Sequence, residues 1–207
     1  NRRGGCQTKG QTIKRLLKSK DDIQDLALKA VGNKERCSVG VSMGVGKTLI
    51  GLKHMAAHYT DYSRFLVVAP KRSIFQSWID DAKKFNMEYL LGSITFTTYI
   101  SLIKQPTSYD VIYLDECHSL LYTHEPWLSN YHGKILGLTG TPPKMAKSEK
   151  GEMVGQFCPV VYKYVVDSAV DDKILNDYRI MLHGVEFDTN KTLKVEKNGK
   201  VWFTSEV

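Results

Sequence analysis

Short apolar runs alternate along this chain with segments of helical periodicity, and this alternation limits the possible folds more than any other feature. The runs predicted as strands are residues 37–41, 65–69, 93–97, 111–114, 135–138 and 160–165. The segments predicted as helices are residues 21–31, 47–58, 73–85 and 98–104. Most of the runs are almost entirely apolar, which is typical of strands buried on both faces. We therefore expect an α/β fold with a mainly parallel sheet, covered by helices on both faces and connected by right-handed crossovers.

The pattern changes near residue 175. From Tyr178 onward the residues alternate as they do in strands, and Asn198-Gly199 lies between alternating apolar residues, which is the strongest short-range hairpin signal. We expect an α/β domain over residues 21–175, and a β extension or the start of a second domain over residues 176–207.

Residues 1–20 are expected to form a separate basic arm. They contain seven Lys and Arg residues and no acidic residue, so the arm carries the whole formal net charge of +7. Such an arm favours binding to a polyanion, most simply a nucleic-acid backbone. The alternative is a solvated terminal tail.

Composition excludes several classes of protein. No apolar run approaches the ~18 residues of a membrane span, and residues 1–20 are charged where a signal peptide is apolar. The four cysteines are far apart and form no C-x-x-C pair, so neither a zinc site nor a disulfide framework is indicated. We expect no membrane partner and an intracellular, cytoplasmic location. Because the chain begins at Asn1, we expect it to be a piece of a longer protein.

A candidate phosphate-binding loop, VSMGVGKT, covers residues 41–48, after a predicted strand and at the start of a predicted helix. Gly44 and Gly46 let the backbone turn its N–H groups inward around phosphates, and the helix N-terminus adds positive potential. Lys47 would neutralise phosphate charge, and Thr48 would offer its hydroxyl to Mg²⁺. The full pattern has Gly at position 41, whereas this chain has Val. An ordinary turn before a helix is the alternative.

Two adjacent carboxylates end the buried run VIYLDECH at residues 111–118. Asp115 and Glu116 would project from the carboxyl edge of a parallel sheet, which is also the edge of the phosphate loop. Asp115 is placed to hold the Mg²⁺ shell, and Glu116 to activate the attacking water. A solvated Asp-Glu turn is the alternative, but it explains neither the apolar strand before the pair nor the loop beside it.

A third motif, ILGLTGTPP at residues 135–143, runs from a predicted strand into Thr139, Gly140 and Thr141. The hydroxyls of Thr139 and Thr141 can form hydrogen bonds with the turn at residues 115–118. A change in that turn can then be transmitted to other parts of the protein.

With these three motifs in order, the chain resembles the first RecA-like domain of a superfamily-two helicase or translocase of the DEAD/H type. Residues 115–118 stand in for the box that gives the type its name, and residues 43–48 are similar to the loop of Swi/Snf-type motors. Residues 65–72 with Trp78 resemble motif Ia, and residues 95–99 resemble motif Ib. The spacing between motifs is similar to that of bacterial and phage DNA helicases, so the cytoplasm of a phage-infected bacterium is one expected location.

The resemblance implies an ATP-dependent DNA helicase or translocase motor with ATP and Mg²⁺ as cofactors. It implies catalytic roles for Lys47 and Glu116, and metal binding by Thr48 and Asp115. The implied cofactor-binding residues are Gln24, Gly44, Val45, Gly46, Lys47 and Thr48. The implied coupling residues are His118, Thr139, Gly140 and Thr141. The implied nucleic-acid-binding residues are Pro70, Lys71, Arg72, Thr97 and Thr98.

Several of these residues have a simpler explanation. Gln24, similar to a glutamine that recognises adenine, would be a solvated residue of an amphipathic helix. Lys71 and Arg72 would be ordinary surface charges at a helix start. Tyr99 would stack on a base or pack in the core, while Tyr113, within a buried strand, is better interpreted as core.

The partners implied are a nucleic acid, DNA more than RNA, and a second RecA-like domain that supplies arginine fingers. No motif of that domain occurs after residue 180, so we expect it to be missing from this chain. Three alternatives stay open: an RNA helicase, a P-loop ATPase that does not act on nucleic acid, and a nucleotide-switched nucleic-acid clamp without turnover.

Overall fold

A computed structural model describes residues 17–176, 192–197 and 200–205 of the chain. The chain divides into two compact units, Asn1–Asn176 and Asp177–Val207. In the second unit, β7 (Thr192–Lys197) pairs antiparallel with β8 (Lys200–Ser205), which confirms the strands of the predicted hairpin. The Asn198-Gly199 turn and the alternating residues from Tyr178 to residue 191 lie outside the described residues, as do residues 1–16 of the basic arm.

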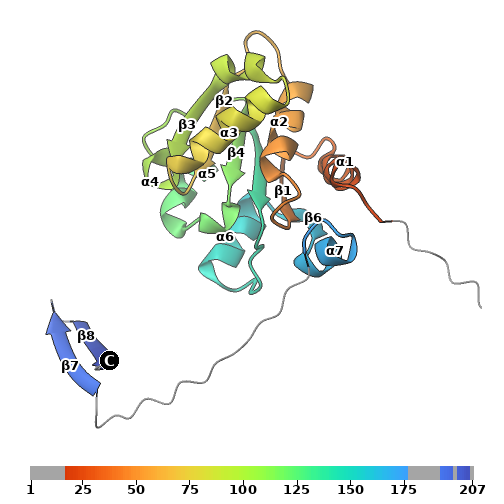
Figure 1. The fold of residues 1–207 in the computed structure, drawn as a ribbon. Helices are drawn as coiled ribbons and strands as arrows, with labels where there is room; N and C mark the ends of the chain where they lie inside the picture. The colour runs from red at the N-terminus through yellow and green to blue at the C-terminus, as the bar shows by residue number, and fades with distance from the viewer. Residues whose placement is uncertain (1–16, 177–191, 198–199, 206–207) are drawn as a thin grey trace, which may run out of the picture. The chain divides into compact units, whose positions relative to one another are not determined.

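One six-stranded sheet forms the centre of the first unit (Figure 1). Its strands are β1 (Arg36–Val41), β2 (Phe65–Ala69), β3 (Ile94–Thr98), β4 (Val111–Asp115), β5 (Lys134–Thr139) and β6 (Val160–Tyr164). Their order across the sheet is β3-β2-β4-β5-β1-β6, and every neighbouring pair is parallel. The predicted parallel α/β fold is therefore confirmed, with all strands ending at the same edge.

Helices cover both faces of this sheet. The helices are α1 (Lys20–Val31), α2 (Lys47–Ala57), α3 (Ser73–Lys84), α4 (Tyr99–Leu102), α5 (Glu125–Ser129), α6 (Glu149–Phe157) and α7 (Val166–Asp171). Short 3₁₀ turns are η1 (Glu88–Ser93), η2 (Cys117–Ser119) and η3 (Tyr122–His124). One core cluster lies between the sheet and α1, α2 and α3, and a second lies between the sheet and α4, α5 and α6.

Alternate residues of the central strands point into the two clusters. Phe65 and Val67 of β2 belong to the cluster under α2 and α3, whereas Leu66 and Val68 belong to the other. This period of two explains why the strands appear as continuous apolar runs in the sequence.

The predicted element bounds differ from the observed ones mainly where helices are short. The helix predicted over residues 98–104 is α4, which spans only Tyr99–Leu102, and β6 ends at Tyr164 rather than at residue 165. The sequence-based prediction missed α5, α6 and α7. Five or six residues are too few to show helical periodicity in α5 and α7, and two glycines weaken the pattern in the nine residues of α6.

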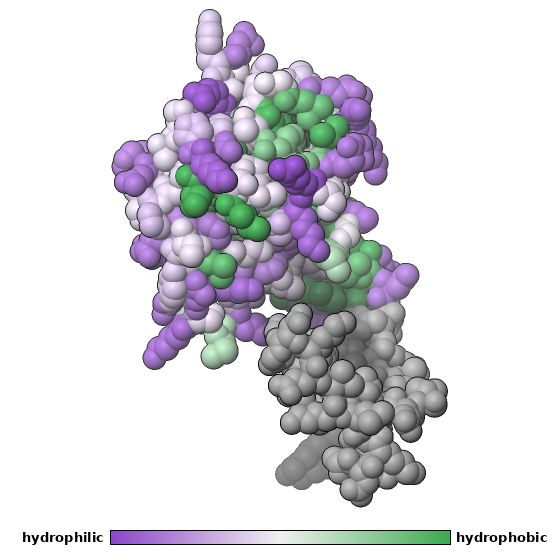
Figure 2. Space-filling view, turned by 90° about the vertical axis from the view of Figure 1, so that its left-hand side faces the viewer, coloured by the Kyte–Doolittle hydropathy of each residue, from purple (hydrophilic) through white to green (hydrophobic). Residues whose placement is uncertain are grey.

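The β3 edge of the sheet, with α4, faces the viewer in Figure 2. This face is mostly hydrophilic, with separate hydrophobic patches. Ile100 and Ile103, at α4 and just after it, are 84% and 58% exposed and add apolar surface at this edge. No helix within the described residues is long and apolar enough to cross a membrane.

Candidate functional site

The sequence motifs meet at the carboxyl edge of the sheet, where the strand order groups them. The ends of β4, β5 and β1 are neighbours, and they carry the Asp115-Glu116 pair, Thr139 and the phosphate loop. The ends of β2 and β3 lie beyond β4 and carry residues 70–72 and 97–98. The candidate nucleotide residues and the candidate nucleic-acid residues therefore occupy adjoining parts of one edge, as ligand sites of open α/β sheets do.

The loop between β1 and α2 has the backbone geometry that its glycines permit. Gly44 and Gly46 have φ angles of 84° and 93°, in the left-handed region that other residues rarely adopt. Val41 is fully buried and pairs with Tyr164 at the end of β1. The departure from the usual glycine pattern thus falls on a strand residue in the core, and the loop proper begins after it.

Gln24 lies against this loop rather than in solvent. Its side chain is 3% exposed, and its amide nitrogen donates a hydrogen bond to the carbonyl oxygen of Val45 at 2.7 Å. Its other amide atom, Oε1, is buried and has no hydrogen-bond partner. It is the single buried side-chain oxygen or nitrogen in this state among the residues that the structure describes. Such an atom is costly to bury, and a ligand with an N–H group would satisfy it.

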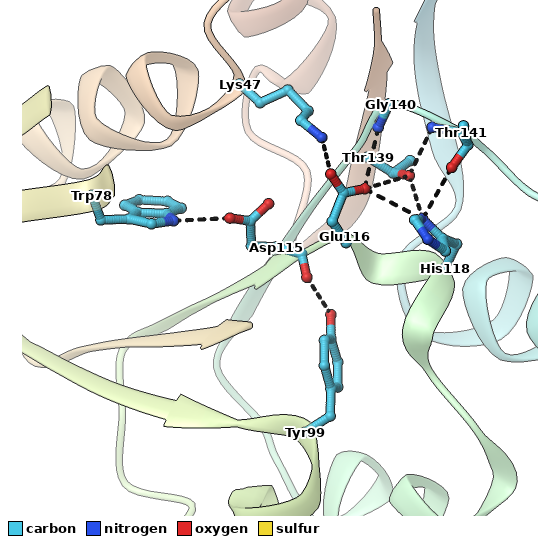
Figure 3. Close-up of polar contacts among 9 residues, drawn as sticks. All are labelled: Lys47, Trp78, Tyr99, Asp115, Glu116, His118, Thr139, Gly140 and Thr141. Carbon is cyan, nitrogen blue, oxygen red and sulfur yellow. Dashed lines mark hydrogen bonds and ion pairs between the residues drawn. The ribbon is translucent and has the colours of Figure 1, made fainter. Parts of the chain in front are cut away.

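Lys47 and Glu116 form an ion pair across the edge (Figure 3). Lys47 opens α2, and Glu116 follows β4 with φ 50° and ψ 55°. A left-handed conformation costs a residue with a side chain about 1 kcal/mol. The turn places the Glu116 carboxylate against the Lys47 ammonium, and its Oε2 atom lies 3.5 Å from the backbone nitrogen of Gly140.

Asp115 is buried at the end of β4 and held from two directions. The indole nitrogen of Trp78 donates to Asp115 Oδ2 at 3.0 Å, and the hydroxyl of Tyr99 donates to the Asp115 carbonyl oxygen at 2.9 Å. Burial raises the pKa of the Asp115 carboxyl, against the opposing effects of the Trp78 hydrogen bond and the Lys47 charge. Tyr99 is 5% exposed and belongs to the core, so it is not a free platform for a base.

The predicted coupling residues contact one another. His118 Nδ1 lies 2.8 Å from Thr139 Oγ1 and 3.4 Å from Thr141 Oγ1. It also lies 3.4 Å from Glu116 Oε2, and Thr139 Oγ1 lies 3.4 Å from the same oxygen. Burial lowers the pKa of His118 below 6.5, so the neutral imidazole predominates at pH 7. The network physically joins the ends of β4 and β5.

The candidate nucleic-acid residues lie on two neighbouring clefts. Arg72, Thr97 and Thr98 line one cleft of about 460 Å³, together with Phe75 and Phe96. Thr97 is 5% exposed, and its hydroxyl accepts a hydrogen bond from Gln105 Nε2 at 3.4 Å.

Pro70 lines the second cleft with Ile100, Ile103 and Leu121. Lys71 is exposed at the carboxyl edge, between β2 and α3. The five predicted residues are therefore close in the fold, but they do not share one groove.

Oxygen donors at the edge fit Mg²⁺ better than other metals. Thr48 is the second residue of α2, next to Lys47, and Asp115 ends β4. No group of three or more His, Cys, Asp or Glu side chains able to hold a metal occurs in the part of the chain that the structure describes. One carboxylate and one hydroxyl, completed by phosphate oxygens, is the usual way in which a protein holds Mg²⁺ at a nucleotide.

Trp78 and Tyr99 contact Asp115, and the sequence does not predict either contact. The sequence relates Trp78 only to motif Ia, and it predicts Tyr99 only as a base-stacking or core residue. Their bonds to Asp115 depend on the packing of α3 and α4, and no spacing in the sequence indicates them.

Comparison with known proteins identifies the family and relates the fold to solved structures. Residues 10–144 match the family described as type III restriction enzyme, res subunit (ResIII). The chain belongs to this family. Its first unit is accordingly a RecA-like domain of the type found in superfamily-two helicases. No curated protein matches the ResIII chain.

Solved structures share the fold of this ResIII domain. The UvsW helicase of bacteriophage T4 is 17% identical with a TM-score of 0.53, over 68% of this chain and 58% of that one. A nuclease-deletion mutant of the Type ISP restriction-modification enzyme LlaGI, in complex with a DNA substrate mimic, is 17% identical with a TM-score of 0.55. The match covers 78% of this chain and 21% of the LlaGI chain. The Pyrococcus furiosus Hef helicase domain is 17% identical with a TM-score of 0.52, and the match covers 68% of this chain and 37% of the Hef chain. The chain thus spans less than two thirds of each of these structures.

Proposed function

We propose that this chain is the first motor domain of an ATP-dependent DNA helicase or translocase. The observation that carries the proposal is the junction at the ends of β1, β4 and β5. There Lys47, at the end of the glycine loop, pairs with Glu116, and Glu116 in turn contacts His118 and Thr139. Asp115 precedes Glu116 at the end of β4. An arrangement of this kind serves phosphoryl transfer, where catalysis consists of positioning and charge stabilisation.

The nucleotide residues divide the work by their position. The backbone of Gly44, Val45 and Gly46 cradles the phosphates at the N-terminus of α2, and Lys47 neutralises their charge. A bound triphosphate competes with Glu116 for the Lys47 ammonium and so releases Glu116 to orient and deprotonate the attacking water.

Gln24 recognises adenine in this proposal. Its Nε2 atom is already bonded to Val45, whereas its buried Oε1 atom is available to accept a hydrogen bond from the exocyclic amino group of the base.

Mg²⁺ would be held by Thr48 and Asp115 and would supply charge neutralisation at the β and γ phosphates. Asp115 reaches this position at the end of β4, directly before Glu116, and the charge of Lys47 is near enough to lower the pKa of its carboxyl against the effect of burial. His118, Thr139 and Gly140 contact Glu116, and Thr141 contacts His118. These residues couple the position of Glu116 to the rest of the domain.

Nucleic acid would bind beside the nucleotide residues. Lys71 and Arg72 are exposed cations at the start of α3, and Thr98 lines the same cleft as Arg72. Contacts of this kind to phosphates position a strand without specifying its sequence. DNA is favoured over RNA because the LlaGI structure, which shares the fold, is in complex with a DNA substrate mimic.

A second RecA-like domain would complete the site. The chain spans only 21–58% of the length of the three structures that share its fold. In a two-domain motor the other domain supplies the arginine that stabilises charge in the transition state. We therefore propose that this domain is the chain's principal protein partner.

Phosphate release from ATP, measured with and without DNA and with and without RNA, tests the proposal. The full-length protein should hydrolyse ATP, more rapidly with DNA than with RNA. Turnover that is independent of any nucleic acid would instead identify a P-loop ATPase of another kind. Nucleic-acid binding that responds to ATP without any phosphate release would identify a clamp.

A further inference from the structure

Two aromatic side chains reach Asp115 from the helices that follow the two candidate nucleic-acid segments. Trp78 lies on α3, which begins just after residues 70–72, and Tyr99 is the first residue of α4, just after residues 97–98. Trp78 donates to the carboxylate of Asp115, while Tyr99 donates to its backbone carbonyl. Figure 3 shows the two rings on different sides of Asp115. The side chain and the backbone of this residue therefore have separate anchors.

The indole of Trp78 is itself held in place by packing. It is 0% exposed, and a Cβ atom added at Gly51 of α2 would lie 2.5 Å from its Cη2 atom. The rings of Trp78 and Tyr113 pack with their centroids 6.2 Å apart. Since a close-packed side chain of this size cannot rotate without moving its neighbours, the direction of the indole N–H is fixed.

The hydrogen bond leaves the carboxylate asymmetric. Oδ2 accepts the indole N–H, and Figure 3 shows the second oxygen directed away from the indole. Partners of this kind, which bond a metal ligand without touching the metal, orient the ligand, and their loss typically weakens metal binding 10- to 100-fold.

We propose that Trp78 and Tyr99 are positioning residues that orient Asp115 for metal binding. The inference rests on the proposed function, because it takes Asp115 as a Mg²⁺ ligand at the nucleotide. It adds two residues, from outside the nucleotide motifs, that determine how well this ligand is presented. The competing view is that both bonds only satisfy buried polar groups and stabilise the core.

Mn²⁺ used in place of Mg²⁺ separates these views, because electron paramagnetic resonance measures its binding directly. The experiment titrates Mn²⁺ into the full-length protein with a non-hydrolysable ATP analogue. Trp78→Phe, which keeps an aromatic ring and removes the N–H, should weaken Mn²⁺ binding by about ten-fold. Tyr99→Phe should weaken it by about five-fold, the effect of one hydrogen bond. The affinity for the analogue without metal should change by less than about two-fold in either variant. A change of that size is roughly the spread in the measured contribution of a single hydrogen bond.

The chain offers matched controls for both changes. The indole nitrogen of Trp127 donates to the carbonyl oxygen of Gln105 at 2.7 Å, and the hydroxyl of Tyr131 donates to the carbonyl oxygen of Lys134 at 3.1 Å. Trp127→Phe and Tyr131→Phe each remove a comparable bond away from Asp115. Both should leave Mn²⁺ affinity unchanged.

Each outcome has one meaning. If the wild-type protein binds no Mn²⁺ with the analogue, the proposed function is wrong and the inference with it. If the wild-type protein binds Mn²⁺ and the variants at 78 and 99 match their controls, the bonds only stabilise the core and the inference alone is overturned. If Trp78→Phe does not fold, the Mn²⁺ affinity of Tyr99→Phe is compared with that of Tyr131→Phe, and equal affinities overturn the inference.

Discussion

The Lys47 ammonium and the Glu116 carboxylate form an ion pair that joins the start of α2 to the end of β4. Their side chains are 15% and 28% exposed, so the pair is partly shielded from water. In the proposed reaction the two groups have different partners, the phosphates for Lys47 and the attacking water for Glu116. Nucleotide binding must therefore break this pair.

Substitutions on the two sides of the pair should have different effects. Lys47→Ala removes the charge that meets the phosphates and should abolish ATP binding. Glu116→Gln keeps a side chain of similar shape, releases Lys47 from the pair and should retain or strengthen ATP binding while hydrolysis stops. Equilibrium binding of a fluorescent ATP analogue and steady-state phosphate release measure the two quantities. Normal hydrolysis by Glu116→Gln would show that another group activates the water.

The contact between His118 and Thr139 should carry the DNA dependence of hydrolysis. Thr139→Val keeps the shape of the side chain and removes the hydroxyl that lies 2.8 Å from His118 Nδ1. We expect DNA stimulation of ATP hydrolysis to fall more than the rate without DNA. His118→Ala should have a similar effect, and the double variant should be no worse than either single one, because both remove the same contact. Fully additive losses would indicate two independent roles.

The basic arm should contribute to the salt dependence of DNA binding. Deleting residues 1–16 removes five of its cations and keeps Ser19, which caps α1 through its bonds with Asp22. If all five cations contact phosphates, the slope of log K against log salt should fall by up to ~4.5, at about 0.9 per contact. A full-length variant with Gln at the five positions separates charge from chain length. An unchanged slope in both proteins would identify the arm as a solvated tail.

Stability should fall in acid because of a buried histidine of α2. Burial lowers the pKa of His54 from 6.5 to about 4, and its Nδ1 atom lies 2.9 Å from the hydroxyl of Tyr113. Between these two pKa values the unfolded chain binds the extra proton. The contribution of His54 is therefore complete above pH 6.5 and is lost as the pH falls toward 4, at up to about 1.4 kcal/mol per pH unit.

Chemical unfolding of wild-type protein and His54→Gln between pH 4 and 7 tests this dependence. The free energy of unfolding of the variant should change less steeply with pH than that of the wild-type protein. Equal slopes would mean that His54 does not titrate differently in the folded and unfolded states.

Much of the site was predictable because parallel strands end at one edge. The loop at residues 41–48, the pair Asp115-Glu116 and Thr139 each follow an apolar run, so a parallel sheet must bring them to the same side. Their adjacency across β4, β5 and β1 required the strand order, which the sequence pattern does not contain.

The contacts of Trp78 and Gln24 could not be predicted in the same way. Trp78 meets Asp115 because α3 packs over Gly51 of α2, and Gln24 meets Val45 because α1 packs near the loop. Helix α6 was missed because Gly151 interrupts its pattern. That glycine is needed where a Cβ atom would lie 2.1 Å from the carbonyl oxygen of Met145. The contacts of Trp78 and Gln24 thus arise from tertiary packing, and the glycine of α6 arises from the close approach of the turn before that helix.

Steady-state ATP hydrolysis by residues 1–207, compared with the full-length protein, tests whether this chain forms one side of a two-domain ATP site. Each protein is measured in the presence and absence of DNA. If the chain forms one side of a two-domain ATP site, residues 1–207 should turn over ATP poorly even with saturating DNA. The full-length protein should be faster by orders of magnitude and depend on DNA, because a missing arginine finger costs ~10³ to 10⁵ in rate. Equal, DNA-stimulated rates from the two proteins would show that residues 1–207 hold a complete active site, and would contradict the two-domain account.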